Sequence, residues 1–293
     1  MTGDGAPRRS DEVERAHLKD PRDASHTMSR YPVDDEFAGL LRRFWIPVWS
    51  VPPGLEAPQK VLQYPVALVV VSAEYARFYG VVPGLSTTTL TGEGWAVGVM
   101  CEPAAGSLVA GGSMAAYTDR FVDVAEVLGD DGTRMVSRVR GAMAADPRSP
   151  AAHRAAMDAV GDALRRFLPI DAEGEQVNEL VAFVEQRPDV TRVAQLCAET
   201  GLSERSLQRL VQRRLGLTPK WLVQRRRLQE AAERLRDRTT TAARVAADLG
   251  YADQSHLTRD WRAFAGLPPL RWIEAEFGIV QDRWRPELAG SVA

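Results

Sequence analysis

The spacing of apolar residues divides the chain into two regions. From about residue 28 to residue 118, apolar residues form short runs rich in Val, Thr, Tyr and Trp, and Pro or Gly residues separate the runs. Several short runs at close spacing are typical of the strands of a small β-sandwich or β-barrel. From about residue 119 onward, the apolar residues recur at the spacing of an α-helix. We therefore expect a β-rich N-terminal region that ends in helices, followed by an all-α C-terminal region.

The first residues carry no such pattern. Residues 1–27 hold almost no large apolar side chain and balance Arg against Asp and Glu, so we expect a disordered tail. Foldable sequence begins at Met28, and the sequence leaves open whether translation starts at Met1 or at Met28. The later boundaries predict a β-rich domain at 28–170, a linker at 171–176, an all-α domain at 177–277 and a C-terminal tail at 278–293.

One helix is predicted at the end of the β-rich domain. Ser149 fits its cap and Pro150 its first turn. Met157, Val160 and Leu164 recur on one face of this helix. That face either packs on the strands or forms the contact of a homodimer, and the pattern leaves both open.

The all-α region contains a first pair of helices joined by a tight turn. An amphipathic segment at 193–199 is followed by Gly201, where glycine suits a backbone position with positive φ. Ser203 then caps a second helix whose inner face carries Leu207 and Leu210. Such a pair is a helix-turn-helix, and its second helix is the one that enters the major groove of DNA. The polar outer face of this second helix supplies the candidate DNA contacts Arg205, Gln208, Arg209 and Arg213.

The same pattern returns about fifty residues later. Gly250 supplies the turn, Asp253 is a plausible cap, and Leu257 and Trp261 form the inner face of the second helix. Arg can pair with guanine and Gln with adenine through two hydrogen bonds each. The outer face of this helix supplies the candidate DNA contacts Gln254, Ser255, His256, Thr258 and Arg259.

A single long helix is predicted between the two units. Trp221, Leu228 and Leu235 fall on one stripe of it. The run Arg225–Arg227 within it fits a solvated face, of which at most one or two side chains can reach phosphate. Two units joined in this way fit successive major-groove segments on one face of DNA, roughly 34 Å apart.

The last hundred residues resemble the DNA-binding domain of the AraC/XylS family of transcriptional regulators. The matching stretches are LCAETGLSERSLQRLVQRRLGLTP, RRRLQEAAERL and VAADLGYADQSHLTRDWRAFAGLPP. The sequence departs from the family at Leu257, where Phe is usual, at Trp261-Arg262, where Phe-Lys is usual, and at Leu267-Pro268-Pro269. These are mostly core positions, so they bear on packing and leave the resemblance intact.

The resemblance has implications for fold and for partners. It implies two helix-turn-helix units joined by a linker helix, with residues 205, 208, 209, 254, 255, 256, 258 and 259 facing double-stranded DNA. Residues 30–168 are more loosely similar to the β-rich sensor domains of the family. The expected fold is therefore α+β with two domains, a small β-barrel or cupin-like domain with C-terminal helices followed by the all-α domain.

Aromatic residues crowd the predicted β-rich domain. Most are expected to belong to its core, while several can line an apolar ligand pocket in the mouth of a barrel. The candidates for such a pocket are Trp49, Tyr64, Phe78 and Trp95.

An enzyme is the alternative from another class, with a β-barrel that converts a small molecule and a helical domain that mediates assembly. A metal centre would need His and carboxylate ligands on neighbouring strands. None of His17, His26, His153 and His256 lies between residues 30 and 118, and no P-loop, GxSxG or HExxH motif is present. We therefore expect no catalytic residue, no metal and no other cofactor.

The net charge of the whole chain argues against DNA binding, whereas the distribution of charge along the chain supports it. The chain has 37 Arg and Lys against 39 Asp and Glu, a net charge of −2. Between Gly201 and Trp272, however, 15 Arg and Lys face 7 Asp and Glu. The near-neutral total combines a basic segment, which can lie on DNA, with an acidic remainder, which should not.

These observations predict a transcriptional regulator in the cytoplasm. Two widely spaced cysteines fit a reducing compartment, and no stretch approaches the ~18 apolar residues of a membrane span. The expected partners are promoter DNA, a small-molecule effector, RNA polymerase and a second copy of the chain, with no membrane. A dimer that binds DNA constitutively, without an effector, is the other alternative within this class.

Overall fold

The structure is a computed structural model that describes residues 17–18, 25–62, 64–236, 240–266 and 268–269. The predicted C-terminal tail, 278–293, lies outside the described residues, as does most of the predicted N-terminal tail. None of the helices in the described part of the chain is long and apolar enough to cross a membrane.

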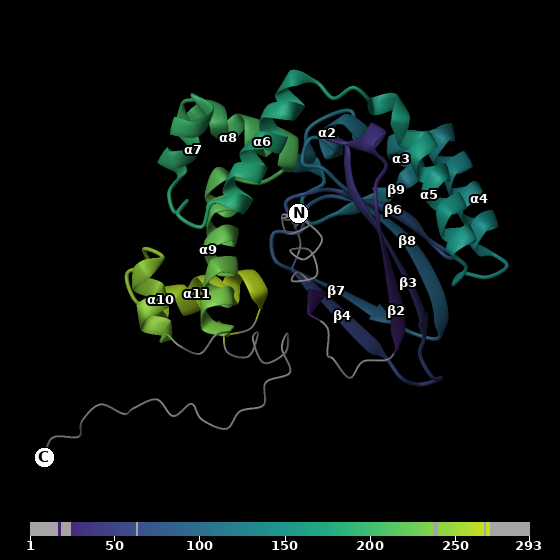
Figure 1. Cartoon of the computed structure of the whole chain (residues 1–293), viewed down its shortest axis with the longest axis horizontal. Coiled ribbons are helices and arrows are strands. Elements are labelled where there is room, and N and C mark those ends of the chain that lie inside the picture. Colours follow the sequence, from purple (N-terminus) through teal and green to yellow (C-terminus); the bar gives the residue numbers. More distant parts are fainter. Residues whose placement is uncertain (1–16, 19–24, 63, 237–239, 267, 270–293) are drawn as a thin grey trace, which may run out of the picture.

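The N-terminal domain is built on two antiparallel sheets (Figure 1). In spatial order, the larger sheet holds β2 (His26–Pro32), β3 (Leu41–Ser50), β8 (Glu93–Cys101), β5 (Leu68–Ser72), β6 (Ala76–Tyr79) and β9 (Phe121–Asp123). The smaller sheet holds β1 (His17–Leu18), β4 (Ala57–Leu62) and β7 (Leu85–Leu90). A β-rich domain is thus confirmed, but among the described residues the two sheets do not close into a barrel.

One strand and the first two residues of another lie in the segment that was expected to be a disordered tail. β1 pairs with β4, and β2 begins at His26 rather than at residue 28. The prediction was wrong here because the hydrogen bonds of β2 come from β3, a distant partner that local composition does not reveal. The run LLRRFW at residues 40–45 belongs largely to β3.

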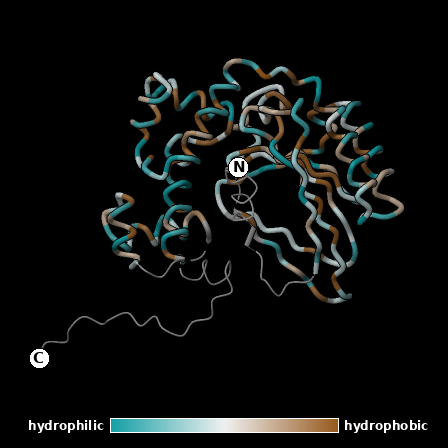
Figure 2. The backbone as a smooth tube through the Cα atoms, in the orientation of Figure 1, coloured by the Kyte–Doolittle hydropathy of each residue, from teal (hydrophilic) through white to brown (hydrophobic). Residues whose placement is uncertain are grey.

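Helices cover one face of the six-stranded sheet. The helices of this domain are α2 (Ala105–Val109), α3 (Val124–Leu128), α4 (Asp130–Met143) and α5 (Pro150–Leu164), with short 3-10 turns at Asp35–Phe37, Met114–Ala116 and Arg165–Phe167. α3, α4 and α5 lie along the outer side of the sheet (Figure 1). Hydrophobic positions run along the strands beneath them (Figure 2).

The apolar face of α5 packs inside this domain. Met157, Val160 and Leu164 are all buried in the core that the helices share with the sheet. Pro150 stands in the first turn, as expected, after Ser149 at the N-cap. Of the two uses left open for this face, packing on the strands is the one the structure adopts, so the face is not available for a dimer.

The C-terminal domain is entirely helical in its described residues. Its helices are α6 (Ala172–Gln186), α7 (Val193–Thr200), α8 (Glu204–Leu215), α9 (Pro219–Arg236), α10 (Ala242–Asp248) and α11 (Gln254–Ala265). The predicted linker at 171–176 is wrong, since Asp171 caps α6 and the next residues form its first turns. Gly174 lies in the first turn of α6, where a Cβ would lie 2.7 Å from the Asp171 carboxylate and 3.0 Å from the Ala104 methyl group.

Candidate functional site

The first helix-turn-helix, α7 and α8, is confirmed in its local geometry. Gly201 ends α7 in the left-handed conformation, with φ 69°. Ser203 caps α8, its Oγ accepting a hydrogen bond from the Ser206 backbone N–H at 3.2 Å. Leu207 and Leu210 are buried against the neighbouring helices. The inner face is thus fixed by packing, which holds the outer face of α8 towards solvent.

The outer face of α8 presents three of its four candidate contacts freely. Arg205, Gln208 and Arg209 are exposed, and no protein partner is recorded for their side chains in the described structure. Arg213 is also exposed, but it forms an ion pair with Glu173 of α6. Contact of Arg213 with DNA would therefore exchange a carboxylate partner for a phosphate.

The second unit, α10 and α11, repeats this geometry with stronger capping. Gly250 provides the left-handed turn, with φ 73°. The Asp253 carboxylate caps α11 by accepting a hydrogen bond from the His256 backbone N–H at 2.7 Å. Leu257 and Trp261 are buried in the core of this unit.

The candidate contacts on α11 differ in exposure. Ser255 and Arg259 are exposed, whereas Gln254, His256 and Thr258 are half-buried. The His256 ring packs edge-on against Tyr251 at 5.2 Å, with Nε2 3.9 Å from a carboxylate oxygen of Asp260. His256 is consequently held by its own unit more firmly than Arg259 is.

The three arginines of the linker helix do not form the solvated face that was expected. Arg226 pairs with Glu230 at 3.2 Å. Arg227 donates to the Leu249 carbonyl at 2.9 Å and stacks 3.8 Å from the Tyr251 ring. Arg225 is only 2% exposed and lies against the N-terminal domain. Charge runs of this kind usually point outward, and only tertiary contacts reveal that these do not.

The N-terminal domain contacts the first helix-turn-helix unit directly. Arg214 of α8 is 6% exposed, pairs with Asp171 and Glu173, and donates to the Ser107 hydroxyl on α2 at 3.0 Å. The Thr118 hydroxyl donates to the Gly216 carbonyl at 2.8 Å. Val81 of the β-rich domain belongs to the same core as α6, α7 and α8.

The linker helix α9 touches the N-terminal domain at two further places. The guanidinium of Arg225 lies 4.3 Å from the centre of the Tyr64 ring. Burial lowers the pKa of Arg225 below its ordinary value, while Tyr64 and Glu185 oppose that shift. Near the start of α9, the Trp221 indole N–H donates to the Pro83 carbonyl at 2.9 Å.

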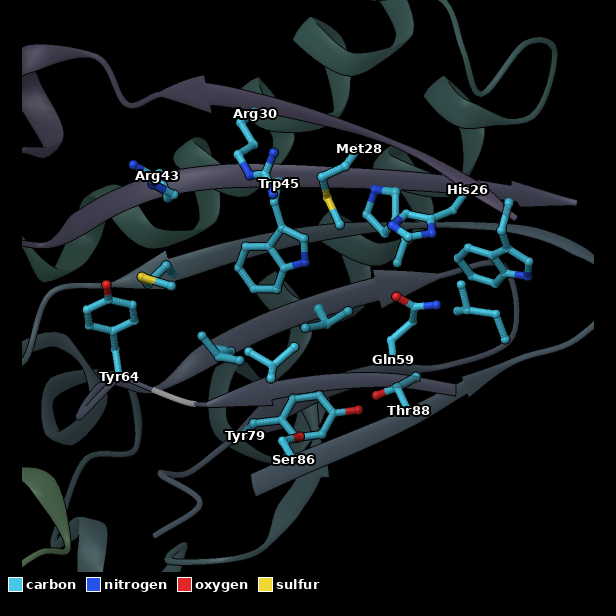
Figure 3. Close-up of a pocket in the computed structure, with 18 of the residues that line it drawn as sticks. His26, Met28, Arg30, Arg43, Trp45, Gln59, Tyr64, Tyr79, Ser86 and Thr88 are labelled. Atoms are coloured by element: carbon cyan, nitrogen blue, oxygen red, sulfur yellow. The ribbon is translucent and has the colours of Figure 1, made fainter. Parts of the chain in front are cut away.

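A cavity of about 220 Å³ lies between the two sheets of the N-terminal domain (Figure 3). Its wall comes from the face of the larger sheet that the helices leave uncovered and from β4 and β7. Alternation along β3 decides which side chains reach it, since Arg43, Trp45 and Trp49 line the cavity while Phe44 and Ile46 are buried in the core behind.

Two glycines on β8 make room for the tryptophans of the cavity. A Cβ at Gly98 would lie 2.3 Å from the Trp45 ring, and a Cβ at Gly94 would lie 2.3 Å from the Trp49 ring. Both indoles therefore lie flat on the backbone of β8. Any larger residue at these glycines would push a ring into the cavity.

The four candidate ligand residues divide equally. Trp49 and Tyr64 line the cavity. Phe78 and Trp95 do not, because their strand positions direct them into the core beneath the helices. That part of the prediction is wrong. Since apolar side chains occupy both faces of the sheet, the sequence did not distinguish the cavity side from the core side.

The sequence also missed several residues of the cavity wall. Arg30, Arg43 and Tyr79 line it, and so does His26, which is 6% exposed. No histidine was expected among the strands, because none lies between residues 30 and 118, but β2 extends back to His26. In the described residues, no three His, Cys, Asp or Glu side chains come together as a metal site would require. Burial raises the pKa of the Cys101 thiol to about 12, which leaves it unreactive.

Comparisons with known proteins identify two parts of the chain. A helix-turn-helix domain family matches residues 196–275, and a domain family of unknown function matches residues 29–123. No curated protein sequence matches the chain.

Solved structures of ToxT from Vibrio cholerae are also similar over most of the chain. ToxT from strain O395 is 13% identical, covering 88% of this chain and 100% of that one, with a TM-score of 0.36. ToxT from strain SCE256, in a structure described as bound to an unsaturated fatty acid, is 12% identical over 90% of this chain and 100% of that one, with a TM-score of 0.38. TM-scores at this level are too low to support an inference about this chain.

Proposed function

We propose that the chain is a transcriptional regulator of the AraC family, and that both of its helix-turn-helix units bind a specific promoter sequence under the control of a small molecule held in the cavity. The observation that carries the proposal is the pair of outer faces on α8 and α11. Both carry an exposed arginine at the same place in the unit, Arg209 and Arg259, with buried leucines and aromatic residues behind.

Sequence choice would come from the second helix of each unit. Arg205, Gln208 and Arg209 on α8 and Gln254, Ser255, Thr258 and Arg259 on α11 have donors that suit base edges and phosphates. Arg213 and His256 would join them only by leaving Glu173 and Tyr251. An 18-residue helix is about 27 Å long, so α9 can set the two units near one helical turn of DNA apart.

Control by an effector would use the contacts between the β-rich domain and α9. Several connections of the chain cross from one sheet to the other, and two of them carry such a contact. The connection between β4 and β5 carries Tyr64, which stacks on Arg225, and the connection between β6 and β7 carries Pro83, which binds Trp221. Since the cavity lies between the sheets, a ligand that changes their separation would move both contacts and therefore α9.

The proposal also places the chain in the cytoplasm with double-stranded promoter DNA, and RNA polymerase and a second copy of the chain as further partners. It requires no catalysis and no cofactor.

DNA binding is tested by a gel-shift titration of the full chain on the DNA upstream of its own gene. Arg209→Ala and Arg259→Ala should each weaken binding by about tenfold to hundredfold, since a bidentate pair with a base contributes ~1–3 kcal/mol. Arg148→Ala is the matched control, because Arg148 is exposed on the loop between α4 and α5. Unchanged affinity in both helix variants, with folding intact, would refute the assignment of the sites.

A further inference from the structure

Three side chains of β3 form a flat apolar strip along one wall of the cavity. Trp45, Pro47 and Trp49, the tryptophan strip, alternate along this strand on one face and all line the cavity. Trp45 pairs across the sheet with Gly98, and its ring lies against that glycine. Trp49 does the same at Gly94. One face of each indole is therefore covered by β8, and the other is turned towards the cavity.

The tryptophan strip is both rigid and long enough for a ring system. The Trp49 indole N–H donates to the Thr91 carbonyl at 3.2 Å, which fixes the orientation of that ring. Strand residues four apart are separated by about 13 Å, which exceeds the length of two fused six-membered rings. A flat ring can stack on such a surface over its whole area, whereas a puckered saturated ring touches it with few atoms. The strip therefore favours a planar ligand.

Hydroxyl groups line the opposite wall of the cavity, on the smaller sheet. Ser86 and Thr88 are two residues apart on β7, so both side chains point to the same side of the strand, and both line the cavity. Figure 3 shows them across the cavity from Trp45. Since a hydroxyl group can donate and accept a hydrogen bond, this wall suits a ligand with a hydroxyl or carbonyl oxygen on its edge.

The volume of the cavity limits the size of the ligand. At about 220 Å³ it is smaller than the ~300–1,000 Å³ pockets of drug-sized ligands, so one or two rings fit. The basic side chains of the wall, His26, Arg30 and Arg43, already interact within the protein and do not require a charged ligand.

We propose that the cavity binds a planar aromatic molecule of one or two rings, with its ring on the tryptophan strip and a hydroxyl or carbonyl oxygen at Ser86 and Thr88. This inference rests on the proposed function, because it names the chemical class of the effector. Such a ligand would contact β3 of the larger sheet and β7 of the smaller one. It would thereby set the separation of the sheets, on which the control of α9 depends.

Two pairs of probes, similar in size and different in planarity, test the class of ligand. The first pair is 2-naphthol and decahydro-2-naphthol, and the second is coumarin and octahydrocoumarin. Isothermal titration calorimetry on the full chain without DNA measures each affinity. At least one aromatic probe should bind about three- to tenfold more tightly than its saturated partner, since only the flat ring stacks on the indoles. Failure of both aromatic probes to bind, or equal affinities within both pairs, would overturn the proposal.

Variants of the tryptophan strip assign the preference to the indoles. Trp45→Leu and Trp49→Leu should bring the aromatic probe and its saturated partner to similar affinities, whereas Trp45→Phe should keep part of the difference. Thermal melting of each variant checks that it is folded. A preference that survives both leucine variants would show that the ring does not lie on the strip.

Variants of β7 test the place of the oxygen. Ser86→Ala and Thr88→Val should each weaken the binding of the aromatic probe by about three- to tenfold, since each removes a hydrogen bond to the ligand. Thr87→Val is the matched control, because Thr87 is exposed and points to the other side of the same strand. Unchanged affinity in both Ser86→Ala and Thr88→Val, or an equal loss in Thr87→Val, would contradict the assignment.

The same proteins separate this proposal from the function on which it rests. Thr88→Val lies far along the chain from α8 and α11, so its affinity for upstream DNA without ligand should equal that of the wild type. If the wild type binds that DNA while the aromatic probes show no preference, only the ligand class is wrong. If the wild type does not bind DNA, the proposed function fails whatever the ligand titrations show.

Discussion

The two helix-turn-helix units share a local design but differ in what lies behind them. The core of the first unit extends into α6 and includes Val81 of the β-rich domain, whereas the core of the second is built from residues of α9, α10 and α11 and the turn between the last two. One position makes the difference plain. Arg214 in α8 binds Asp171, Glu173 and Ser107, while Phe264, fifty residues later in α11, packs against Trp221.

Because of this difference, the two units are positioned in different ways. The first unit is fixed to the sensor domain, so its orientation follows that domain. The second unit is joined chiefly through α9, and Trp221 contacts the cores of both units as well as Pro83. A movement of α9 would therefore change the position of the second unit relative to the first, which is the quantity that two half-sites on DNA would sense.

The largest effect is expected from the glycines that end α8 and α11. Both have positive φ, 72° at Gly216 and 68° at Gly266. A Cβ at Gly216 would also lie 2.4 Å from the Thr118 hydroxyl and 2.6 Å from the Met114 carbonyl, whereas one at Gly266 meets nothing within 4 Å. In urea unfolding, Gly216→Ala should lower the free energy of unfolding by about 3 kcal/mol and Gly266→Ala by about 1 kcal/mol. Equal losses of unfolding free energy in the two variants would mean that both units are attached to the β-rich domain in the same way.

A smaller effect is expected where α9 begins. Trp221→Phe keeps an aromatic ring near Phe264 but removes the hydrogen bond to Pro83, which should cost about 1 kcal/mol in thermal or urea unfolding. Basal DNA affinity should stay within about twofold, because Trp221 is remote from the outer faces of α8 and α11, whereas the change in affinity caused by an effector should shrink. An undiminished effector response would exclude this contact from the coupling.

The smallest effect is expected from acid. Burial raises the pKa of Asp171, but the Arg214 guanidinium and the Gly174 backbone N–H outweigh it and hold the pKa below its ordinary value of 3.8. Because the unfolded chain binds this proton more tightly, the contribution of Asp171 to stability is complete above pH 4 and is lost as the pH falls below it. The carboxylate is 52% exposed, so the loss should be a fraction of 1 kcal/mol.

Asp171→Asn isolates that contribution from those of other carboxylates. Asn also caps a helix, so α6 should keep its start. The difference in unfolding free energy between wild type and variant should narrow between pH 4 and pH 2. A difference that stays constant with pH would show that Asp171 does not stabilise the junction through its charge.

The helix-turn-helix units were predictable because their signals are local. Ser203 and Asp253 cap helices within three residues of themselves, and Gly201 and Gly250 take turns that other residues avoid. Periodicity likewise gave the inner faces of α8 and α11, since the apolar residues behind each helix repeat at its own period.

The junction and the cavity were not predictable in the same way. Arg225 carries the same charge as any solvated arginine, and its burial depends on tertiary contacts such as that with Tyr64, which is distant in sequence. Phe78 and Tyr79 are neighbours on β6, yet one faces the core and the other the cavity, and alternation alone does not say which. Such assignments depend on how the two sheets and the helices pack together, which is a property of the whole fold.

Hydrogen exchange tests most directly the claim that the sensor domain holds the first unit and leaves the second attached through α9. Backbone amides open in cooperative units whose stability reflects their buried contacts. The amides of α8 at Leu207 and Leu210 should exchange as slowly as those of the six-stranded sheet, and the amides of α11 at Leu257 and Trp261 should exchange faster, in a separate step. Equal protection of α8 and α11 across the same range of times would contradict the account.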